Sequence, residues 1–194
     1  NYWINNNIGF GHCRLAIIDK SSNASQPMKS SNERYILSYN GEVYNFNELK
    51  KILEKKYKFT SSSDTEVVLY SLIEWGTDAL SKFNGMFALS FFDRKKQELI
   101  LARDRYGIKP LYIFKNHKIF SFASEQKSII VQKSFEKKIE YEAFMEYFTF
   151  QNILTNKTFF KDIYLLQPGY FGVFNEQKEC CCRINCSIFK NLFT

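Results

Sequence analysis

Residues 38–45 decide the fold of this chain, and they read Ser38-Tyr39-Asn40-Gly41-Glu42-Val43-Tyr44-Asn45. The apolar run at residues 35–37 predicts a strand immediately before them. The apolar spacing from about residue 46 to residue 55 predicts a helix immediately after them. The Asn40-Gly41 pair is therefore expected in a turn, at the point where a strand gives way to a helix.

The same pair could also take part in chemistry. Glycine lets a ligand approach the backbone closely, and an asparagine side chain offers an NH₂ donor beside the next backbone N–H. Two donors that converge on one point stabilise a negative oxygen as it forms. Alone, the pair is compatible with a plain turn and with such an oxyanion hole, so the rest of the chain has to decide between them.

The composition favours one folded domain. The chain has 194 residues, of which 45% are hydrophobic and 18% aromatic, enough for a sizeable core. The net charge is +7, but the lysines are scattered and form no arginine-rich block, so we expect no nucleic-acid partner. No apolar run approaches the roughly 20 residues of a membrane helix, and no signal peptide opens the chain, so we expect no membrane partner.

The five cysteines do not form a spaced disulfide framework. Cys13 stands alone, whereas the other four crowd the end of the chain at Cys180, Cys181, Cys182 and Cys186. A reduced, cytoplasmic setting is the simpler interpretation. Three consecutive cysteines point alternately in an extended segment and have no histidine nearby, so we expect no metal site.

Two charged residues stand out in otherwise apolar or capping positions. Residues 11–19 predict a buried strand whose single basic residue is Arg14. Its head could reach solvent, or its guanidinium could bind a carboxylate through two hydrogen bonds. Asp64 precedes a second helix predicted over residues 67–75. It could cap that helix, or it could accept hydrogen bonds from an ammonium group.

The remaining pattern predicts strands and helices in separate runs. We expect a strand within residues 1–11, a short helical piece at 79–83, a meander of strands at 86–93, 98–104, 111–115 and 118–124, helices at 125–131 and 141–148, and a last strand at 170–174. This order predicts an α+β fold of two sheets with helices outside. The chain has no glycine-rich phosphate loop, metal-type histidine pair or Gly-x-Ser-x-Gly motif, and His12 and His117 are expected to be structural or exposed.

Several segments together resemble the glutaminase domain of glutamine-dependent asparagine synthetases. They occur in order and at compatible spacing, over roughly residues 1–174, and leave 175–194 as a divergent, cysteine-rich tail. The matching segments are Gly11-His12-Cys13-Arg14-Leu15-Ala16-Ile17-Ile18-Asp19, Asn40-Gly41-Glu42-Val43-Tyr44-Asn45, Ser63-Asp64-Thr65-Glu66, Asn84-Gly85-Met86-Phe87-Ala88, Ala102-Arg103-Asp104-Arg105-Tyr106-Gly107-Ile108-Lys109-Pro110-Leu111-Tyr112, Phe122-Ala123-Ser124-Glu125 and Leu165-Leu166-Gln167-Pro168-Gly169.

The resemblance implies a class-II glutamine amidotransferase with the N-terminal-nucleophile fold, a four-layer α/β/β/α sandwich of two mostly antiparallel sheets. It also implies a role for each candidate residue. Arg14 would bind the α-carboxylate of glutamine and Asp64 its α-ammonium. Asn40 and Gly41 would form the oxyanion hole. The rest of the pocket would be made by Leu15, Ile17, Ile18 and Glu42.

In the family that this chain resembles, the nucleophile is an N-terminal cysteine, which lies ahead of the segments matched here. The chain opens with Asn1, and Cys13 lies mid-strand without a free amine, so we expect an incomplete domain that does not hydrolyse glutamine alone. The domain would need no cofactor or metal of its own. ATP and Mg²⁺ would serve a synthetase domain on the same chain that activates aspartate, and a homodimer is compatible with this organisation.

Two other interpretations stay open at this point. The chain could be a non-catalytic module that binds glutamine or a partner protein, or it could serve the amidation of another carboxylate substrate. A nucleic-acid binder is suggested only by the net charge of +7.

Overall fold

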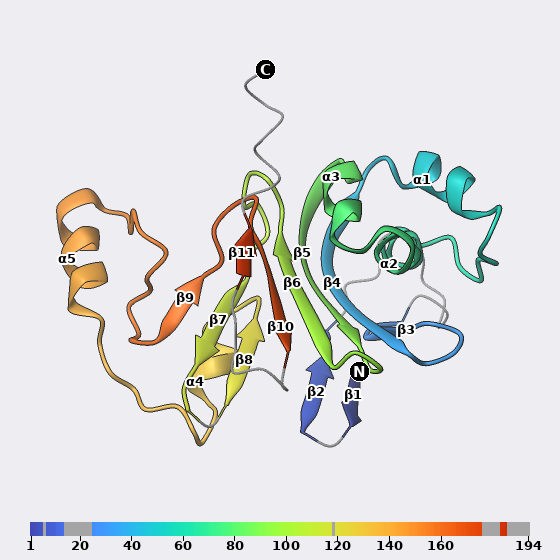
Figure 1. The fold of residues 1–194 in the computed structure, drawn as a ribbon. Helices are drawn as coiled ribbons and strands as arrows, with labels where there is room; N and C mark the ends of the chain where they lie inside the picture. Colours follow the sequence, from blue (N-terminus) through green and yellow to red (C-terminus); the bar gives the residue numbers. More distant parts are fainter. Residues whose placement is uncertain (6, 14–24, 118, 176–182, 186–194) are drawn as a thin grey trace.

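Strand β4 (Tyr35–Val43) lies next to the edge strand of the larger of two packed sheets in the computed structural model of the chain (Figure 1). The structure describes residues 1–5, 7–13, 25–117 and 119–175, together with the backbone of 183–185. The larger sheet has six strands in the order β11-β10-β6-β5-β4-β3, and all its neighbouring strands are antiparallel. The other five strands are β3 (Met28–Lys29), β5 (Gly85–Asp93), β6 (Glu98–Arg103), β10 (Phe171–Asn175) and β11 (Arg183–Asn185).

Helices cover one face of this sheet, because every second residue of β4 and β5 is apolar and points toward them. Leu37, Tyr39 and Val43 of β4 belong to this core, to which α2 contributes Val67, Val68, Leu69, Tyr70 and Leu72. Ser63 is the N-cap of α2 and accepts a hydrogen bond from Thr65 N–H, and Gly76 is the C-cap of this helix. The covering elements are α1 (Phe46–Leu53), α2 (Asp64–Trp75), η2 (Gly76–Asp78) and α3 (Ala79–Lys82).

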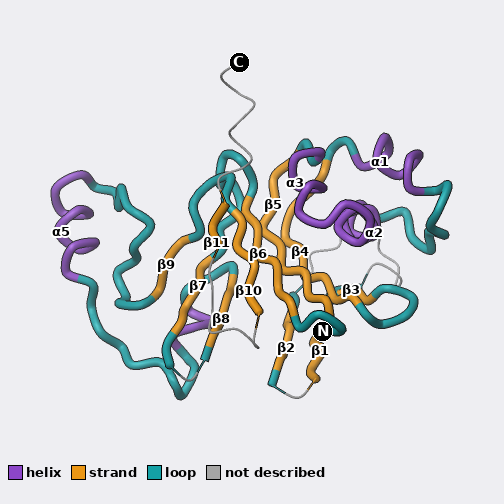
Figure 2. Tube along the Cα trace, in the orientation of Figure 1, coloured by secondary structure: helices purple, strands orange, loops and turns teal. Residues whose placement is uncertain are grey.

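The other face of the six-stranded sheet packs on a three-stranded sheet of order β8-β7-β9. The strands of both sheets occupy the middle of the molecule, and helices lie outside them (Figure 2). The apolar layer that contains residues of both sheets includes Ala88, Leu101, Leu111, Leu166 and Phe174. The second sheet consists of β7 (Tyr112–Lys115), β8 (Phe120–Ala123) and β9 (Ile163–Leu165), and the hairpin β1 (Tyr2–Asn5) and β2 (Ile8–Gly11) forms a separate pair.

Two helices follow the second sheet. The short α4 (Lys127–Ile130) buries Ile129 against Phe114 and Ile163, so it forms a partial fourth layer. Helix α5 (Tyr141–Phe150) projects to one side of the sandwich and buries only Ala143 (Figure 1). The α+β class, the antiparallel sheets and the flanking helices expected from the sequence are therefore confirmed.

Three expectations about local structure are wrong. Asn40 and Gly41 do not form a turn, because β4 continues through them to Val43. The strands expected in one meander divide between two sheets: β5 and β6 pair in the larger sheet, and β7 and β8 pair in the smaller one. The second helix begins at Asp64, because its N-cap is Ser63 and not Asp64 itself. Among the described residues, no helix is long and apolar enough to cross a membrane.

Candidate functional site

The outer edge of β4, on the side away from β5, carries the polar groups of its odd-numbered residues. Tyr35 accepts a hydrogen bond from Ser30 N–H on this edge, and Tyr39 bonds with Gln26 there. Because backbone groups in a strand point alternately to its two sides, the N–H of Gly41 also faces this edge. Strand β3 pairs only with Ile36 and Leu37, so it does not cover Gly41. No described residue accepts a hydrogen bond from the Gly41 N–H, which leaves this donor available to a ligand.

Asp64 lies beside this free donor. Its Oδ2 accepts hydrogen bonds from Tyr39 Oη at 2.8 Å and from the Val43 N–H at 3.1 Å, and the residue is 5% exposed. Its other oxygen, Oδ1, accepts nothing from a described residue. As the first residue of α2, Asp64 also lies where the helix dipole favours negative charge. A buried carboxylate with a spare oxygen can bind a cationic group such as an ammonium.

The Tyr39 hydroxyl stays protonated beside the Asp64 carboxylate. Burial, with the Asp64 carboxylate beside the hydroxyl, raises the pKa of Tyr39 far above its ordinary value. The phenol therefore stays a neutral donor and keeps the Asp64 carboxylate in place. At the end of β4, the Asp64 carboxylate therefore joins the Tyr39 hydroxyl and the Val43 N–H in one hydrogen-bonded unit.

Asn40 extends from the other face of the strand. Its Nδ2 lies 3.4 Å from Ser124 Oγ, at the end of β8 in the second sheet. Asn40 and Glu42 are half-buried, and their even positions place them on the opposite face from Tyr39 and Val43. A ligand that contacts both Asn40 Nδ2 and Asp64 must therefore cross the edge of β4 at Gly41.

Glycine at position 41 is required by the neighbouring strand. A Cβ at Gly41 would lie 2.1 Å from the carbonyl oxygen of Met86, and a Cβ at Gly85 would lie 2.1 Å from the carbonyl oxygen of Glu42. Met86 and Glu42 are paired across β5 and β4. The two glycines therefore let the backbones of β4 and β5 meet closely next to the free Gly41 N–H.

The candidate residues from the expected first buried strand cannot be placed. Arg14, Leu15, Ile17 and Ile18 lie outside the described residues, as does the cysteine cluster at 180–186. Of the remaining candidates, Gly41 and Asp64 lie on one edge of β4, and Asn40 and Glu42 lie on its adjoining face. The described residues contain no group of three or more His, Cys, Asp or Glu that could hold a metal ion.

Sequence reasoning missed a rigid polar cluster around Asp104. This fully buried carboxylate accepts hydrogen bonds from the N–H groups of Phe87, Tyr106, Ile108 and Lys109. The buried Arg103 donates to the carbonyls of Lys109, Leu166 and Gly107, and Arg105 donates to those of Phe83 and Ser81.

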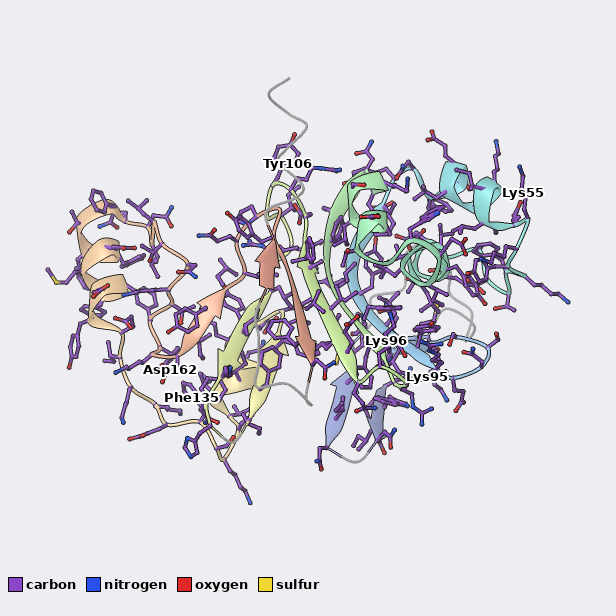
Figure 3. All side chains as sticks on the ribbon, viewed as in Figure 1. Lys55, Lys95, Lys96, Tyr106, Phe135 and Asp162 are labelled. Atoms are coloured by element: carbon purple, nitrogen blue, oxygen red, sulfur yellow. The ribbon has the colours of Figure 1, made fainter. Side chains whose placement is uncertain are left out.

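The consequence of this cluster is a fixed loop after β6. Burial lowers the pKa of Arg103, against the opposing effect of the Asp104 carboxylate. The loop holds Tyr106 outward, 84% exposed, at the tip of the connection (Figure 3). Its signal in the sequence is the run Arg103-Asp104-Arg105 at the end of an apolar strand, where consecutive charges need partners.

Comparison with known families gives a match over most of the chain. Residues 1–183 match the family described as glutamine amidotransferase domain. The chain is 38% identical over 169 residues to asparagine synthetase [glutamine-hydrolyzing] 1 of Bacillus subtilis (strain 168), which covers 87% of this chain and 26% of that protein. It is 33% identical over 178 residues to amidase chry2 of Gibberella zeae, which covers 90% of this chain and 26% of that protein. The chain thus spans about a quarter of the length of these relatives.

A solved structure supports the same fold. The glutamine phosphoribosylpyrophosphate amidotransferase from B. subtilis, complexed with ADP and GMP, superposes with a TM-score of 0.59 at 23% identity. The superposition covers 90% of this chain and 33% of that one. Together with the family match, this fold similarity shows that the chain belongs to the class-II glutamine amidotransferase domains and is homologous to the corresponding domain of asparagine synthetases.

Proposed function

We propose that this chain is the glutamine-binding part of an enzyme that releases ammonia from glutamine and uses it to amidate aspartate. The observation that carries the proposal is that the Asp64 carboxylate and the Gly41 N–H lie on the same edge of β4, where no described residue accepts a hydrogen bond from Gly41. A zwitterionic amino acid needs a carboxylate for its ammonium group, and an amide under attack needs donors for its developing oxyanion.

The proposed roles follow from these two needs. Asp64 Oδ1 accepts from the α-ammonium of glutamine, and Arg14 binds its α-carboxylate. The Gly41 N–H and Asn40 Nδ2 donate to the tetrahedral oxygen when the side-chain amide is attacked. Donors of this kind contribute about 2.7–4 kcal/mol each in comparable enzymes. Glu42 lies beside them and, with Leu15, Ile17 and Ile18, completes the pocket.

The nucleophile in this proposal is the thiol of an N-terminal cysteine whose own α-amine acts as base. Attack forms a thioester and releases ammonia, and water then releases glutamate. Binding of glutamine through Asp64 and Arg14 does not involve this thiol, so it can be measured separately from hydrolysis. ATP and Mg²⁺ are assigned to a separate synthetase domain in the cytoplasm, in keeping with the 26% of the asparagine synthetase relative that this chain covers.

Calorimetry with glutamine tests the proposal. Asp64→Asn and Arg14→Ala should each weaken binding about 10- to 100-fold, because each removes one charge-assisted contact of about 1.5–3 kcal/mol. Asp93→Asn is a matched control, since Asp93 is equally buried but pairs with Arg34 at the opposite end of β4. Equal affinity in Asp64→Asn and in the parent, or no binding by the parent, would contradict the proposal.

A second acceptor substrate has one observation in its favour. The chain is nearly as similar to a protein named amidase chry2 as to the asparagine synthetases. Amidation of a carboxylate other than aspartate would leave the glutamine site unchanged. The acceptor can be identified by supplying candidate carboxylates with ATP to the enzyme that contains both domains, and measuring which one is amidated.

A further inference from the structure

Gln26 takes the place of a strand beside the candidate site. Strand β3 pairs Met28 with Leu37 and Lys29 with Ile36, so the same register places position 26 opposite Tyr39. There the ladder is completed by a side chain: Gln26 Nε2 donates to Tyr39 O at 2.8 Å, and Gln26 Oε1 accepts from Tyr39 N at 2.6 Å. Gln26 is 5% exposed, so these two bonds are shielded from water.

The position of these bonds matters for the donor at Gly41. Tyr39 and Gly41 are successive residues whose polar groups face the same edge of β4. Asp64 fixes the far end of this edge through Val43 N–H, and Gln26 fixes the near end through Tyr39. The Gly41 N–H lies between two anchored positions, which sets its direction before a ligand arrives. Preorganised donors are effective because they need not reorient during the reaction.

We propose that Gln26 is a positioning residue that aims the Gly41 N–H at the oxygen of bound glutamine. The inference rests on the proposed function for the identity of the ligand. The Gln26 amide satisfies both groups of Tyr39 at any pH, because it donates and accepts at once. A carboxylate can accept from Tyr39 N but cannot donate to Tyr39 O, and it would add negative charge to this buried edge.

This chemistry gives a test that a general loss of stability would not reproduce. In Q26E the introduced carboxyl is a near-isostere of the amide, and its protonated form can both donate and accept. Burial raises the pKa of carboxyl groups, so at about pH 5 it should be protonated and at about pH 8 ionised. Glutamine affinity of Q26E should fall at least about ten-fold at the higher pH and return to within about three-fold of the parent at the lower pH.

Two further variants define the comparison. Q26M, which lacks both hydrogen-bonding groups and adds no charge, should bind glutamine at least about ten-fold more weakly at both pH values. Q97E is the matched control, because Gln97 Nε2 donates to Arg94 O in the β5–β6 hairpin, away from Tyr39, and it should match the parent. Measuring the parent at both pH values controls for any effect of pH on glutamine binding through the charged groups of the unaltered chain, such as Asp64 and Glu42.

Each outcome decides the proposal. Parent-like affinity of Q26E and Q26M at both pH values would overturn it, as would an equal loss in Q97E. If the parent does not bind glutamine, the proposed function fails separately, and the ligand-free Gly41 amide resonance decides the role of Gln26. A pH-dependent displacement of that resonance in Q26E but not in Q97E would support the positioning role, and its absence would overturn it.

Discussion

The close contact of β4 and β5 at Gly41 makes a sharp prediction for Gly41→Ala. The new Cβ would lie 2.1 Å from Met86 O and 2.7 Å from Phe87 Cα. Ordinary contacts begin near 3.4 Å, so the strands would have to separate by about 1.3 Å (3.4 − 2.1). Both clashing atoms are backbone and cannot rotate away. Overpacking in a core costs about 1–3 kcal/mol, and we expect the upper end of that range here.

The assay is chemical denaturation followed by circular dichroism. Gly41→Ala should lower the free energy of unfolding by about 3 kcal/mol, a large share of the roughly 5–15 kcal/mol of a typical domain. Gly11→Ala in β2 is the control, because a Cβ there meets nothing within 4 Å, and it should stay within about 0.5 kcal/mol of the parent. Gly85→Ala should cost about as much as Gly41→Ala.

The double variant Gly41→Ala/Gly85→Ala tests the reason for the cost. Both new Cβ atoms would press on the same pair, Glu42 and Met86, so strands already separated by the first substitution should accept the second at lower cost. We expect the double variant to lose clearly less than the sum of the two single losses. A Gly41→Ala chain within about 0.5 kcal/mol of the parent would refute the close contact of the two strands.

Three further predictions concern the core and the charges of the fold. Ser71→Ala should stabilise the chain by about 0.5–1 kcal/mol, because the buried Ser71 hydroxyl has no partner among the described residues; a loss in the denaturation assay would contradict this. Burial alone would raise the pKa of Asp93, but hydrogen bonds from Arg34, Lys96 N–H and Lys95 N–H lower it. Asp93 therefore takes up its proton at a higher pH in the unfolded state than in the folded state, so the stability that it provides is present above about pH 4 and is lost as the pH falls. Asp93→Asn should make the free energy of unfolding fall less steeply as the pH is lowered. The same dependence of this free energy on pH in Asp93→Asn and in the parent would contradict this prediction. Phe83→Ala should lower the free energy of unfolding by about 3–5 kcal/mol and Phe148→Ala by less than about 1 kcal/mol, since Phe83 is 1% exposed and Phe148 is 62% exposed. Similar decreases in melting temperature for the two variants would contradict this difference in burial.

The sequence predicted the elements whose apolar pattern is long and regular. The helices at α1, α2 and α5 and the strands at β5, β6 and β10 follow from periodicity, since a buried face repeats every two or every three to four residues. Strands β3 and β9 were missed because two or three residues are too few to show a period. The division of the meander between two sheets depends on packing that no local pattern encodes.

The candidate site was predictable in part. Asn40, Gly41 and Asp64 stood out, but Asn-Gly is so common in turns that the predicted conformation of this pair was wrong. The reason for glycine is the β5 backbone, which is distant in sequence. Gln26 carried no signal, because a lone glutamine in a polar loop looks the same whether its amide is free or pairs with Tyr39 thirteen residues away.

We propose that glutamine binds along the β4 edge between Gln26 and Asp64. A titration of the ¹⁵N-labelled chain with glutamine, followed through its backbone amide resonances, tests this most directly. We predict saturable shifts of the Gly41 and Val43 amides, with Gly11 and Gly172 unmoved. Saturable shifts elsewhere that leave Gly41 unchanged, or no shifts at all, would contradict the account.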